Sequence, residues 1–228
     1  LNGEDKFKSG KVPLQALLVV YPYRMYVVTI EGTGINSMAD LKGKRVSTGS
    51  PGSATEVMAF RVIEAAGLDK DKDMKRERLG VSESVNAVKD RKIDAFFWVG
   101  GIPTAAVTDL AATPGLKMKL IDHGDLADKM NAKHGKLYTA SKIKAGSYPG
   151  YDKDNSITEV WNLIVTGDKM SNDDAYAIVK TLVEKKADIV AVHKEAESFT
   201  LDNQVQERSP IPCHPGAMKY FKEKGIGK

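Results

Sequence analysis

Residues 44–67 read KRVSTGSPGSATEVMAFRVIEAAG and contain two structural patterns in immediate succession. The first residues form a short apolar run that is typical of a buried strand, and the last carry apolar side chains at helical spacing as far as Gly67. Between the two patterns lie the glycine, proline, serine and threonine residues of a tight turn. A strand that passes directly into a helix is the repeating unit of α/β folds, so this stretch indicates that fold class.

The same alternation continues along the rest of the chain. We expect strands at residues 15–20, 25–30, 45–48, 93–99, 116–122 and 157–167. We expect helices at residues 35–43, 53–67, 82–92, 100–112, 125–134, 171–194 and 214–225. The sequence therefore predicts an α/β fold with a mainly parallel sheet.

Three prolines and glycine-rich stretches predict where this regular structure is interrupted. Tyr21 and Pro22 should separate the first two strands, because proline restricts the preceding residue and lacks a backbone donor. Pro103 should lie near the first turn of its helix, where a missing N–H costs nothing. Residues 142–156 are rich in Gly, Pro, Asp and Lys and predict a loop or linker.

The composition excludes several classes of protein. Hydrophobic residues make up 42% and charged residues 28% of the 228 residues, as in an ordinary soluble domain. The 34 basic and 30 acidic side chains occur in mixed runs, which is typical of a solvated surface and not of a nucleic-acid interface. The longest apolar stretch, residues 14–30, contains Pro22 and Arg24 and is shorter than the ~20 residues of a membrane span. The single cysteine, Cys213, has no disulfide partner and no neighbouring metal ligands, so we expect neither a metal nor a cofactor.

The turn GSPGSAT is a candidate anion site. Its backbone N–H groups around residues 52–55 should point out of a helix N-terminus, beside the hydroxyls of Ser50, Ser53 and Thr55. Unsatisfied donors and the positive end of the helix dipole both favour an anion there. The spacing and the lysine of a nucleotide P-loop are absent, so a small carboxylate fits better than a triphosphate. The alternative is that Ser50 or Ser53 only caps the helix and Glu56 completes a capping box.

A second candidate turn lies in the stretch FFWVGGIPT, residues 96–104. Gly100 and Gly101 would let the backbone approach another group closely, and Thr104 lies where the next helix begins. Both turns follow predicted strands, and α/β folds bind ligands beyond the carboxyl ends of their strands. The alternative is an ordinary tight turn with its aromatic residues in the core.

Several sequence blocks, taken in order, resemble the TAXI family of solute-binding proteins, the extracytoplasmic immunogenic receptors associated with TRAP transporters. The blocks are YP (21–22), ADLKGKRVSTGSPGSATE (39–56), KDRKIDAFFWVGGIPT (89–104), AGSYPG (145–150) and IPCHPGAMKYFKEKG (211–225). The resemblance covers nearly the whole chain. It implies a type II periplasmic-binding-protein fold, in which two α/β lobes joined by crossover strands close on a small organic acid or amino acid. It also implies delivery of that ligand, glutamate in several members, to the membrane subunits of a sodium-driven TRAP transporter.

The resemblance assigns site residues and lobes by position. The ligand carboxylate would be held by Ser50, Gly52, Ser53, Ala54 and Thr55. The neighbouring wall would be formed by Gly100, Gly101 and Thr104, and hydroxyls or rings near the lobe boundaries would come from Tyr21 and Tyr148. Lobe two would span residues 32–136, and lobe one residues 1–31 and 137–228.

The beginning of the chain departs from the family pattern. Family members start with a signal peptide and a first-lobe segment that carries GTG and a tyrosine-rich turn, whereas residues 1–7 here resemble the NGTGxF stretch that follows that segment. We therefore expect that the front of lobe one is missing, which would expose a sheet edge and apolar surface. We also expect such a chain to bind its ligand weakly or not at all by itself.

Three other functions stay open at this point. An enzyme on the same fold could use Ser50 or Ser53 as a nucleophile, but there is no GxSxG motif, and the histidines lie outside the two turns. The histidines are His123, His134, His193 and His214. A regulatory effector domain would normally accompany a helix-turn-helix, which we do not find. A scaffold or antigen without a ligand would require both turns to be purely structural.

Overall fold

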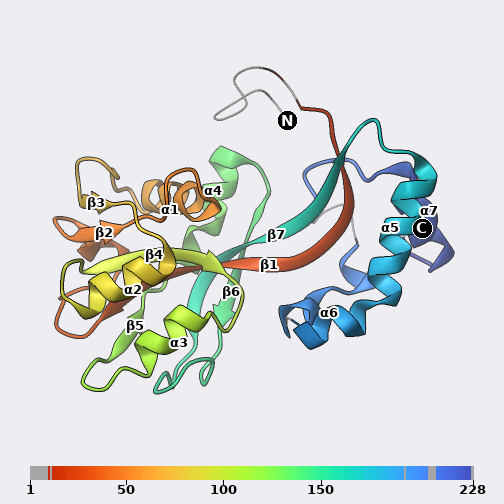
Figure 1. Ribbon diagram of the computed structural model, residues 1–228. Helices are drawn as coiled ribbons and strands as arrows, with labels where there is room; N and C mark the ends of the chain where they lie inside the picture. Colours follow the sequence, from red (N-terminus) through yellow and green to blue (C-terminus); the bar gives the residue numbers. More distant parts are fainter. Residues whose placement is uncertain (1–9, 11, 193, 205–208, 227–228) are drawn as a thin grey trace. The chain divides into compact units, whose positions relative to one another are not determined.

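The computed structural model describes residues 10, 12–192, 194–204 and 209–226 (Figure 1). Residues 1–7 and His193, both mentioned above, lie outside these ranges. The chain forms two compact units, which we call unit 1 (residues 1–22 and 161–228) and unit 2 (residues 23–160). The boundaries between the units lie within two long strands, β1 (Leu14–Ile30) and β7 (Asn155–Gly167). The lobe boundaries inferred from the sequence, after residues 31 and 136, lie outside both strands.

The described strands form one sheet in the order β3-β2-β4-β1-β7-β6, with β5 paired to β1. The shorter strands are β2 (Arg45–Ser47), β3 (Lys75–Glu77), β4 (Ala95–Gly100), β5 (Met118–Leu120) and β6 (Tyr138–Ile143). Strand β2 pairs in parallel with β3 and β4. Strand β1 pairs antiparallel with β4 and β5, and β6 pairs antiparallel with β7. The parallel pairing is thus found where short strands alternate with helices.

Helices cover both faces of the sheet in unit 2 (Figure 1). The helices are α1 (Ala54–Ala65), α2 (Val81–Lys89), α3 (Ala105–Ala111) and α4 (Ala127–His134), with 3-10 turns at η2 (Met38–Leu41) and η3 (Gly124–Leu126). Helices α1 and α4 contribute to one apolar core and α2 and α3 to another. Successive residues of β1 alternate between these cores, with Met25 and Val27 in the first and Tyr26 and Val28 in the second. The predicted α/β fold class is therefore confirmed.

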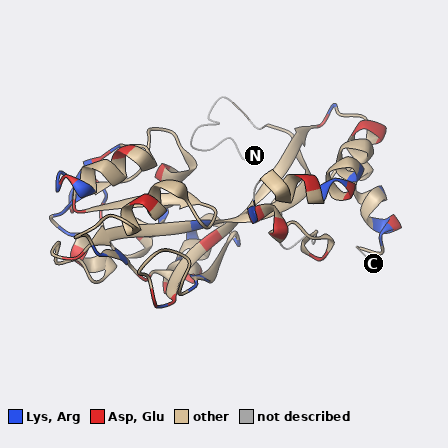
Figure 2. Ribbon diagram, turned by 60° about the horizontal axis from the view of Figure 1, so that its bottom comes forward, with Lys and Arg blue, Asp and Glu red and all other residues tan. Residues whose placement is uncertain are grey.

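Unit 1 has a core of its own. Its helices are α5 (Asn172–Glu184), α6 (Lys186–Val192) and α7 (Pro215–Glu223), and its 3-10 turns are η4 (Lys194–Ser198) and η5 (Leu201–Asn203). Helices α5 and α7 pack together, and a Cβ atom on Gly216 would lie only 2.2 Å from the carbonyl oxygen of Asn172. This close approach explains the glycine at the start of α7. Basic and acidic residues are interspersed over both units (Figure 2).

Strand β1 is continuous, and the predicted interruption at Tyr21 and Pro22 is wrong. Pro22 precedes the ladder between β1 and β4, which begins at Arg24. Its missing N–H therefore removes no hydrogen bond from that ladder. Pro103 directly precedes Thr104, the N-cap of α3, and so lies near the first turn as predicted.

Residues 142–156, predicted as a loop or linker, include the ends of two paired strands. Strands β6 and β7 form an antiparallel hairpin, and only residues 144–154 connect them. This loop is ordered by its own contacts, because Asp154 Oδ1 accepts a hydrogen bond from the Ala145 N–H at 3.1 Å, and Tyr148 and Tyr151 are buried. The Gly- and Pro-rich composition of the segment gave no indication that Tyr148 and Tyr151 are buried.

The long helix predicted at residues 171–194 is divided at Lys185 into α5 and α6. Ser171 is the N-cap of α5, since its Oγ accepts a hydrogen bond from the Asp174 N–H. Helix α5 buries Ala175 and Val179, whereas no residue of α6 is buried. Helix α5 therefore packs on the core of unit 1, whereas α6 lies at the surface against η4. Among the described residues no helix has the length and apolar character needed to cross a bilayer.

Candidate functional site

Three turns meet where parallel strands end in unit 2. They are the β2–α1 turn (residues 48–53), the β3–α2 turn (78–80) and the β4–α3 turn (101–104). Ser47 is in register with Glu77 on one side and Phe96 on the other, so the carboxyl ends of β3, β2 and β4 form one edge of the sheet, here called the carboxyl edge. All predicted site residues except Tyr21 belong to unit 2.

Hydrogen bonds hold the turns together at this edge. The Val99 N–H donates to Thr55 Oγ1 at 3.3 Å, which ties the end of β4 to the first turn of α1. The Ser84 hydroxyl of α2 donates to Ser47 Oγ at 2.9 Å. Ser50 lies beside Gly80, because a Cβ atom added to Gly80 would be 3.5 Å from Ser50 Oγ. The structure thus brings together the two turns that the sequence singled out, together with a third that it did not.

The β2–α1 turn uses its polar groups to begin α1. Gly49 has φ +93, and a Cβ atom on it would lie 2.6 Å from Thr55 Cγ2, so only glycine fits there. Ser53 is the N-cap, because its Oγ accepts a hydrogen bond from the Glu56 N–H at 3.1 Å and donates to the Ser50 carbonyl at 2.7 Å. The Gly52 N–H donates to Glu56 Oε2 at 2.7 Å. The serine cap of the alternative is therefore present at Ser53, whereas Glu56 accepts from the Gly52 N–H and not from that of the N-cap, as a capping box would require.

Glu56 places the protein's own carboxylate at this helix end. Its side chain is only 9% exposed and lies 3.0 Å from Arg78 Nε and 3.6 Å from Arg76 Nη1. Burial opposes ionisation, but the Gly52 N–H and the two guanidinium groups outweigh it, so the pKa of Glu56 lies below its usual value. Arg76 also pairs with Asp71 at 3.2 Å, so the two arginines are balanced by two carboxylates.

Some donors of the same turn are left over. In the part of the chain that the structure describes, neither the Ser50 hydroxyl nor the N–H groups of Ala54 and Thr55 have a hydrogen-bond partner. Ser50 is half-buried and Ala54 is exposed. First-turn N–H groups point out of a helix N-terminus. This part of the turn can therefore accept an oxygen ligand from outside the chain.

The β4–α3 turn is closed by internal hydrogen bonds. The Thr104 hydroxyl donates to the Gly101 carbonyl at 2.8 Å and accepts from Trp98 Nε1 at 3.0 Å. The Thr104 N–H donates to the hydroxyl of Tyr148 at 3.0 Å. A Cβ atom on Gly100 would lie 2.7 Å from Trp98 Nε1, so glycine makes room for the indole ring. The polar atoms of Thr104, predicted as part of a ligand wall, are used within the protein.

The predicted ligand group Tyr148 lies inside unit 2 and is 2% exposed. Its hydroxyl donates to that of Tyr26 at 2.9 Å, and the Tyr26 hydroxyl donates to the Gly101 carbonyl at 3.0 Å. Burial, reinforced by Tyr148, raises the pKa of Tyr26 well above its usual value, so this hydroxyl keeps its proton. Sequence reasoning missed Tyr26, because in an apolar strand it is indistinguishable from a core residue.

Tyr21 belongs to unit 1, where its carbonyl accepts a hydrogen bond from Asn162 Nδ2 at 3.2 Å. Its side chain is half-buried in β1. Its predicted role at a ligand stays a prediction.

The described histidines lie away from the serines of the β2–α1 turn. His123 is fully buried and its Nδ1 is 2.9 Å from the Ile121 carbonyl; burial lowers its pKa to about 4. His134 lies 3.4 Å from Glu64, and His214 caps α7 in unit 1. No described histidine is hydrogen-bonded to Ser50 or Ser53. Within the described ranges no cluster of His, Cys, Asp and Glu could hold a metal ion.

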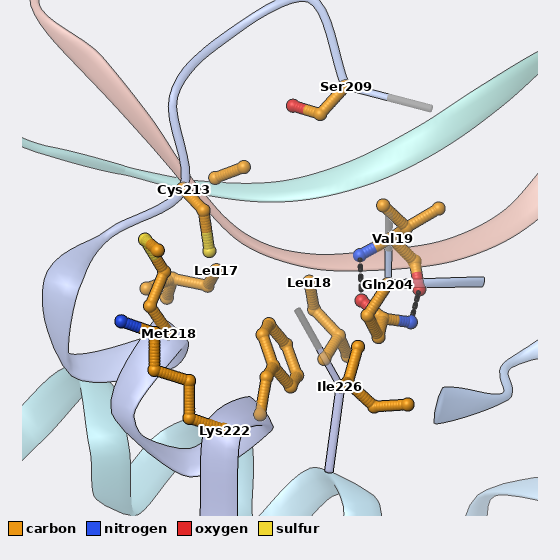
Figure 3. Close-up of a pocket in the computed structure, with 11 residues that line it drawn as sticks. Leu17, Leu18, Val19, Gln204, Ser209, Cys213, Met218, Lys222 and Ile226 are labelled. Carbon is orange, nitrogen blue, oxygen red and sulfur yellow. Dashed lines mark hydrogen bonds between the residues drawn. The ribbon is translucent and has the colours of Figure 1, made fainter. Parts of the chain in front are cut away.

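Unit 1 contains a separate apolar pocket of about 130 Å³ (Figure 3). Its lining consists of Ala16, Leu17, Leu18, Val19, Gln204, Ser209, Cys213, Met218, Phe221, Lys222 and Ile226. The Gln204 amide is occupied, since it exchanges two 2.8 Å hydrogen bonds with the backbone of Val19, and the Ser209 hydroxyl donates to the Ile211 carbonyl. Burial raises the pKa of the Cys213 thiol. The pocket suits an apolar group better than a charged solute, and no predicted site residue lines it.

Comparison with known proteins gives one family and a set of distant structures. The sequence model described as the NMT1-like family matches residues 1–225. The substrate-binding protein of an amino acid ABC transporter is 14% identical, with 86% of this chain and 66% of that protein covered and a TM-score of 0.41. The periplasmic aliphatic sulphonate-binding protein of Escherichia coli is 12% identical, with 97% and 72% covered and a TM-score of 0.46. A putative L-cystine ABC transporter protein of Listeria monocytogenes is 16% identical, with 90% and 70% covered and a TM-score of 0.43. The chain therefore spans slightly less than two thirds of the first of these proteins.

Proposed function

The chain belongs to the NMT1-like family, and from this premise we propose that it is a solute-binding protein that holds a small carboxylate ligand without changing it chemically. The observation that carries the proposal is a set of donors at the carboxyl edge that have no hydrogen-bond partner among the residues the structure describes. The Ser50 hydroxyl and the Ala54 and Thr55 N–H groups lie together at the start of α1, where parallel strands of an α/β fold end.

The helix dipole favours an anion at the turn despite the nearby Glu56. The Glu56 carboxylate is balanced by Arg78 at 3.0 Å and by Arg76 at 3.6 Å, and Arg76 is shared with Asp71 at 3.2 Å. The positive end of the α1 dipole remains to attract an anion. A charged hydrogen bond contributes about 1.5–3 kcal/mol. About three such bonds, less the cost of ordering the ligand, are enough for micromolar affinity.

The narrower proposal rests on the TAXI-like sequence blocks. In it the ligand is glutamate or a related amino acid or organic acid, and the protein is an extracytoplasmic receptor that delivers the ligand to a TRAP transporter. In this proposal lobe two comprises residues 32–136, and lobe one comprises residues 1–31 and 137–228. In this proposal Ser50, Ala54 and Thr55 bind the carboxylate directly, while Gly52 and Ser53 shape the turn.

A hydrolase that uses Ser50 or Ser53 is the weaker candidate. Such a nucleophile needs a base within hydrogen-bond reach. Glu56 accepts from Gly52 and contacts Arg78, and its lowered pKa makes it a poor proton acceptor. The geometry at the carboxyl edge therefore favours binding over catalysis.

An NMR titration of the ¹⁵N-labelled chain tests the proposal and detects even millimolar affinity. The probes are L-glutamate, L-glutamine, L-aspartate and succinate. We expect one class of acid to shift the amide signals of Ser50, Ala54 and Thr55 in a saturable manner. Absence of shifts at these amides with every acid, or shifts confined to the apolar pocket of unit 1, would overturn it.

A pair of serine variants tests whether Ser50 contributes to ligand affinity. Ser50→Ala should weaken binding of the acid that shifts the wild-type signals, because it removes one ligand donor. Ser141→Ala is the matched control, since Ser141 is also half-buried and its hydroxyl has no partner among the described residues. Equal affinity in the two variants would exclude Ser50 from the site.

A further inference from the structure

We infer that Tyr26 and Tyr148 are positioning residues of the carboxyl edge: their paired hydroxyls fix the β4–α3 turn from inside the core. Neither residue would touch the ligand. The consequence for ligand affinity rests on the proposed function, whereas the consequence for the turn does not.

The hydrogen bonds around this turn form one connected set. Starting from the Thr104 N–H, the donors run to the Tyr148 hydroxyl at 3.0 Å, from there to the Tyr26 hydroxyl at 2.9 Å, and on to the Gly101 carbonyl at 3.0 Å. The Thr104 hydroxyl donates to the same carbonyl at 2.8 Å. The set therefore closes on Thr104 and holds both ends of the turn.

Every hydroxyl in this set both donates and accepts. Tyr148 accepts from Thr104 and donates to Tyr26, and Tyr26 accepts from Tyr148 and donates to Gly101. Such bonds polarise one another in a site of low dielectric, so the loss of one weakens the next. Removing either hydroxyl should affect the whole turn and not a single contact.

The burial of the two rings separates them from any ligand. Tyr26 is 0% and Tyr148 2% exposed, and the rings meet edge to face with centroids 6.2 Å apart. A ligand could reach these hydroxyls only by breaking the set that fixes the turn. In this inference Tyr148 acts on a ligand indirectly, and the direct contact expected from the sequence stays a prediction.

Tyr148 also connects the turn to the loop of residues 144–154. That loop is braced by the Gly146 N–H, which donates to the Tyr151 carbonyl at 2.7 Å, and by Asp154 Oδ1, which accepts from the Ala145 N–H. Most of the loop is exposed, and Tyr148 is the side chain that it sends to the β4–α3 turn. The order of the loop and that of the turn are thus coupled through one hydroxyl.

Tyrosine-to-phenylalanine variants test the inference, with amide hydrogen exchange of Thr104 and the indole N–H signal of Trp98 as readouts. Tyr148→Phe and Tyr26→Phe should each accelerate exchange at Thr104 about tenfold, the factor that corresponds to one hydrogen bond. Both variants should also shift the Trp98 indole signal. Tyr151→Phe is the matched control, because Tyr151 lies in the same core and its buried hydroxyl has no partner among the described residues.

The decisive variant is Tyr26→Phe, because Tyr26 does not contact the Thr104 N–H. Unchanged exchange at Thr104 in this variant would mean that the bonds act independently and would overturn the inference. Tyr148→Phe alone could not decide this, since it removes the acceptor of that N–H directly.

Titration with the acid that binds the wild type extends the test to the site. Both variants should lose affinity about tenfold, whereas Tyr151→Phe should not. A merely structural role would lower the melting temperature and leave affinity unchanged, and that result would overturn the positioning role. If the wild type binds no acid, the proposed function fails, and Thr104 exchange still decides whether the tyrosine pair fixes the turn.

Discussion

The β2–α1 and β4–α3 turns both contain glycine, proline and a hydroxyl side chain and both lie at the carboxyl edge, but they use their polar groups differently. In the β2–α1 turn, Glu56 satisfies the Gly52 N–H and leaves the Ser50 hydroxyl without a partner among the described residues. In the β4–α3 turn, the Thr104 hydroxyl and N–H both have partners inside the protein. A run of glycine, serine and threonine therefore marks a turn, but the surrounding core determines which donors stay available to a ligand.

The difference follows from what lies beneath each turn. The backbone of the β4–α3 turn is hydrogen-bonded to two buried tyrosine hydroxyls, that of Tyr26 from β1 and that of Tyr148 from the 144–154 loop. The β2–α1 turn has instead a carboxylate from its own helix, held by Arg76 within β3 and by Arg78 directly after it. Local capping uses the groups nearest in sequence and leaves the rest of the helix end open.

The largest effect is expected for Gly49→Ala, which tests whether the β2–α1 turn has only one conformation. The new Cβ atom would lie 2.6 Å from Thr55 Cγ2 at a residue with φ +93. Strain and overlap together should lower the free energy of unfolding by about 2–5 kcal/mol, measured by urea denaturation. Gly43→Ala is the control, because Gly43 has φ +78 but nothing within 4 Å, and it should cost only about 1–2 kcal/mol. Equal losses would show that the turn yields to the side chain.

A smaller effect is expected for Glu56→Gln, which removes the internal carboxylate of the β2–α1 turn. The loss of charged hydrogen bonds should cost about 1–3 kcal/mol at neutral pH. Because the folded pKa of Glu56 is lowered, its ionised form adds stability above the unfolded pKa of about 4.3, and this is lost as pH falls through the folded pKa. The difference between wild type and variant should thus disappear in acid.

The matched control for that variant is Glu83→Gln in α2. Glu83 likewise accepts a hydrogen bond from an N–H before its helix, that of Gly80 at 2.8 Å, but its side chain is exposed. We expect a cost of about 0.5 kcal/mol or less. A cost as large as that of Glu56→Gln would contradict the role assigned to Arg76 and Arg78.

The smallest effects separate capping from binding within one turn. Ser53→Ala removes the N-cap and should cost about 1 kcal/mol in thermal or urea unfolding. Ser50→Ala removes a hydroxyl without a described partner and should change stability by no more than about 0.5 kcal/mol. If Ser50→Ala proved the more destabilising, Ser50 would be a structural residue and the proposed anion site would lose its hydroxyl.

The sequence by itself determined the α/β class and the strand-to-helix turns, and it limited the cap of α1 to Ser50 or Ser53. These features depend on local spacing, on glycine's access to positive φ and on short-range hydrogen bonds, and each of these is determined by residues that are close in sequence. The continuity of β1 was not predictable in this way, because β1 pairs with strands distant in the chain. The hairpin of β6 and β7 joins consecutive strands, but the Gly- and Pro-rich composition of residues 142–156 indicated a loop at their ends.

Only the tertiary structure decided which turn donors are free. The hydroxyl of Tyr148 reaches Thr104 across 44 residues, and that of Tyr26 reaches Gly101 across 75. In sequence both tyrosines are unremarkable members of a loop and an apolar strand. Long-range pairing of polar groups follows from how the core packs and not from local pattern, so the sequence could name the turns but not the atoms that each of them offers.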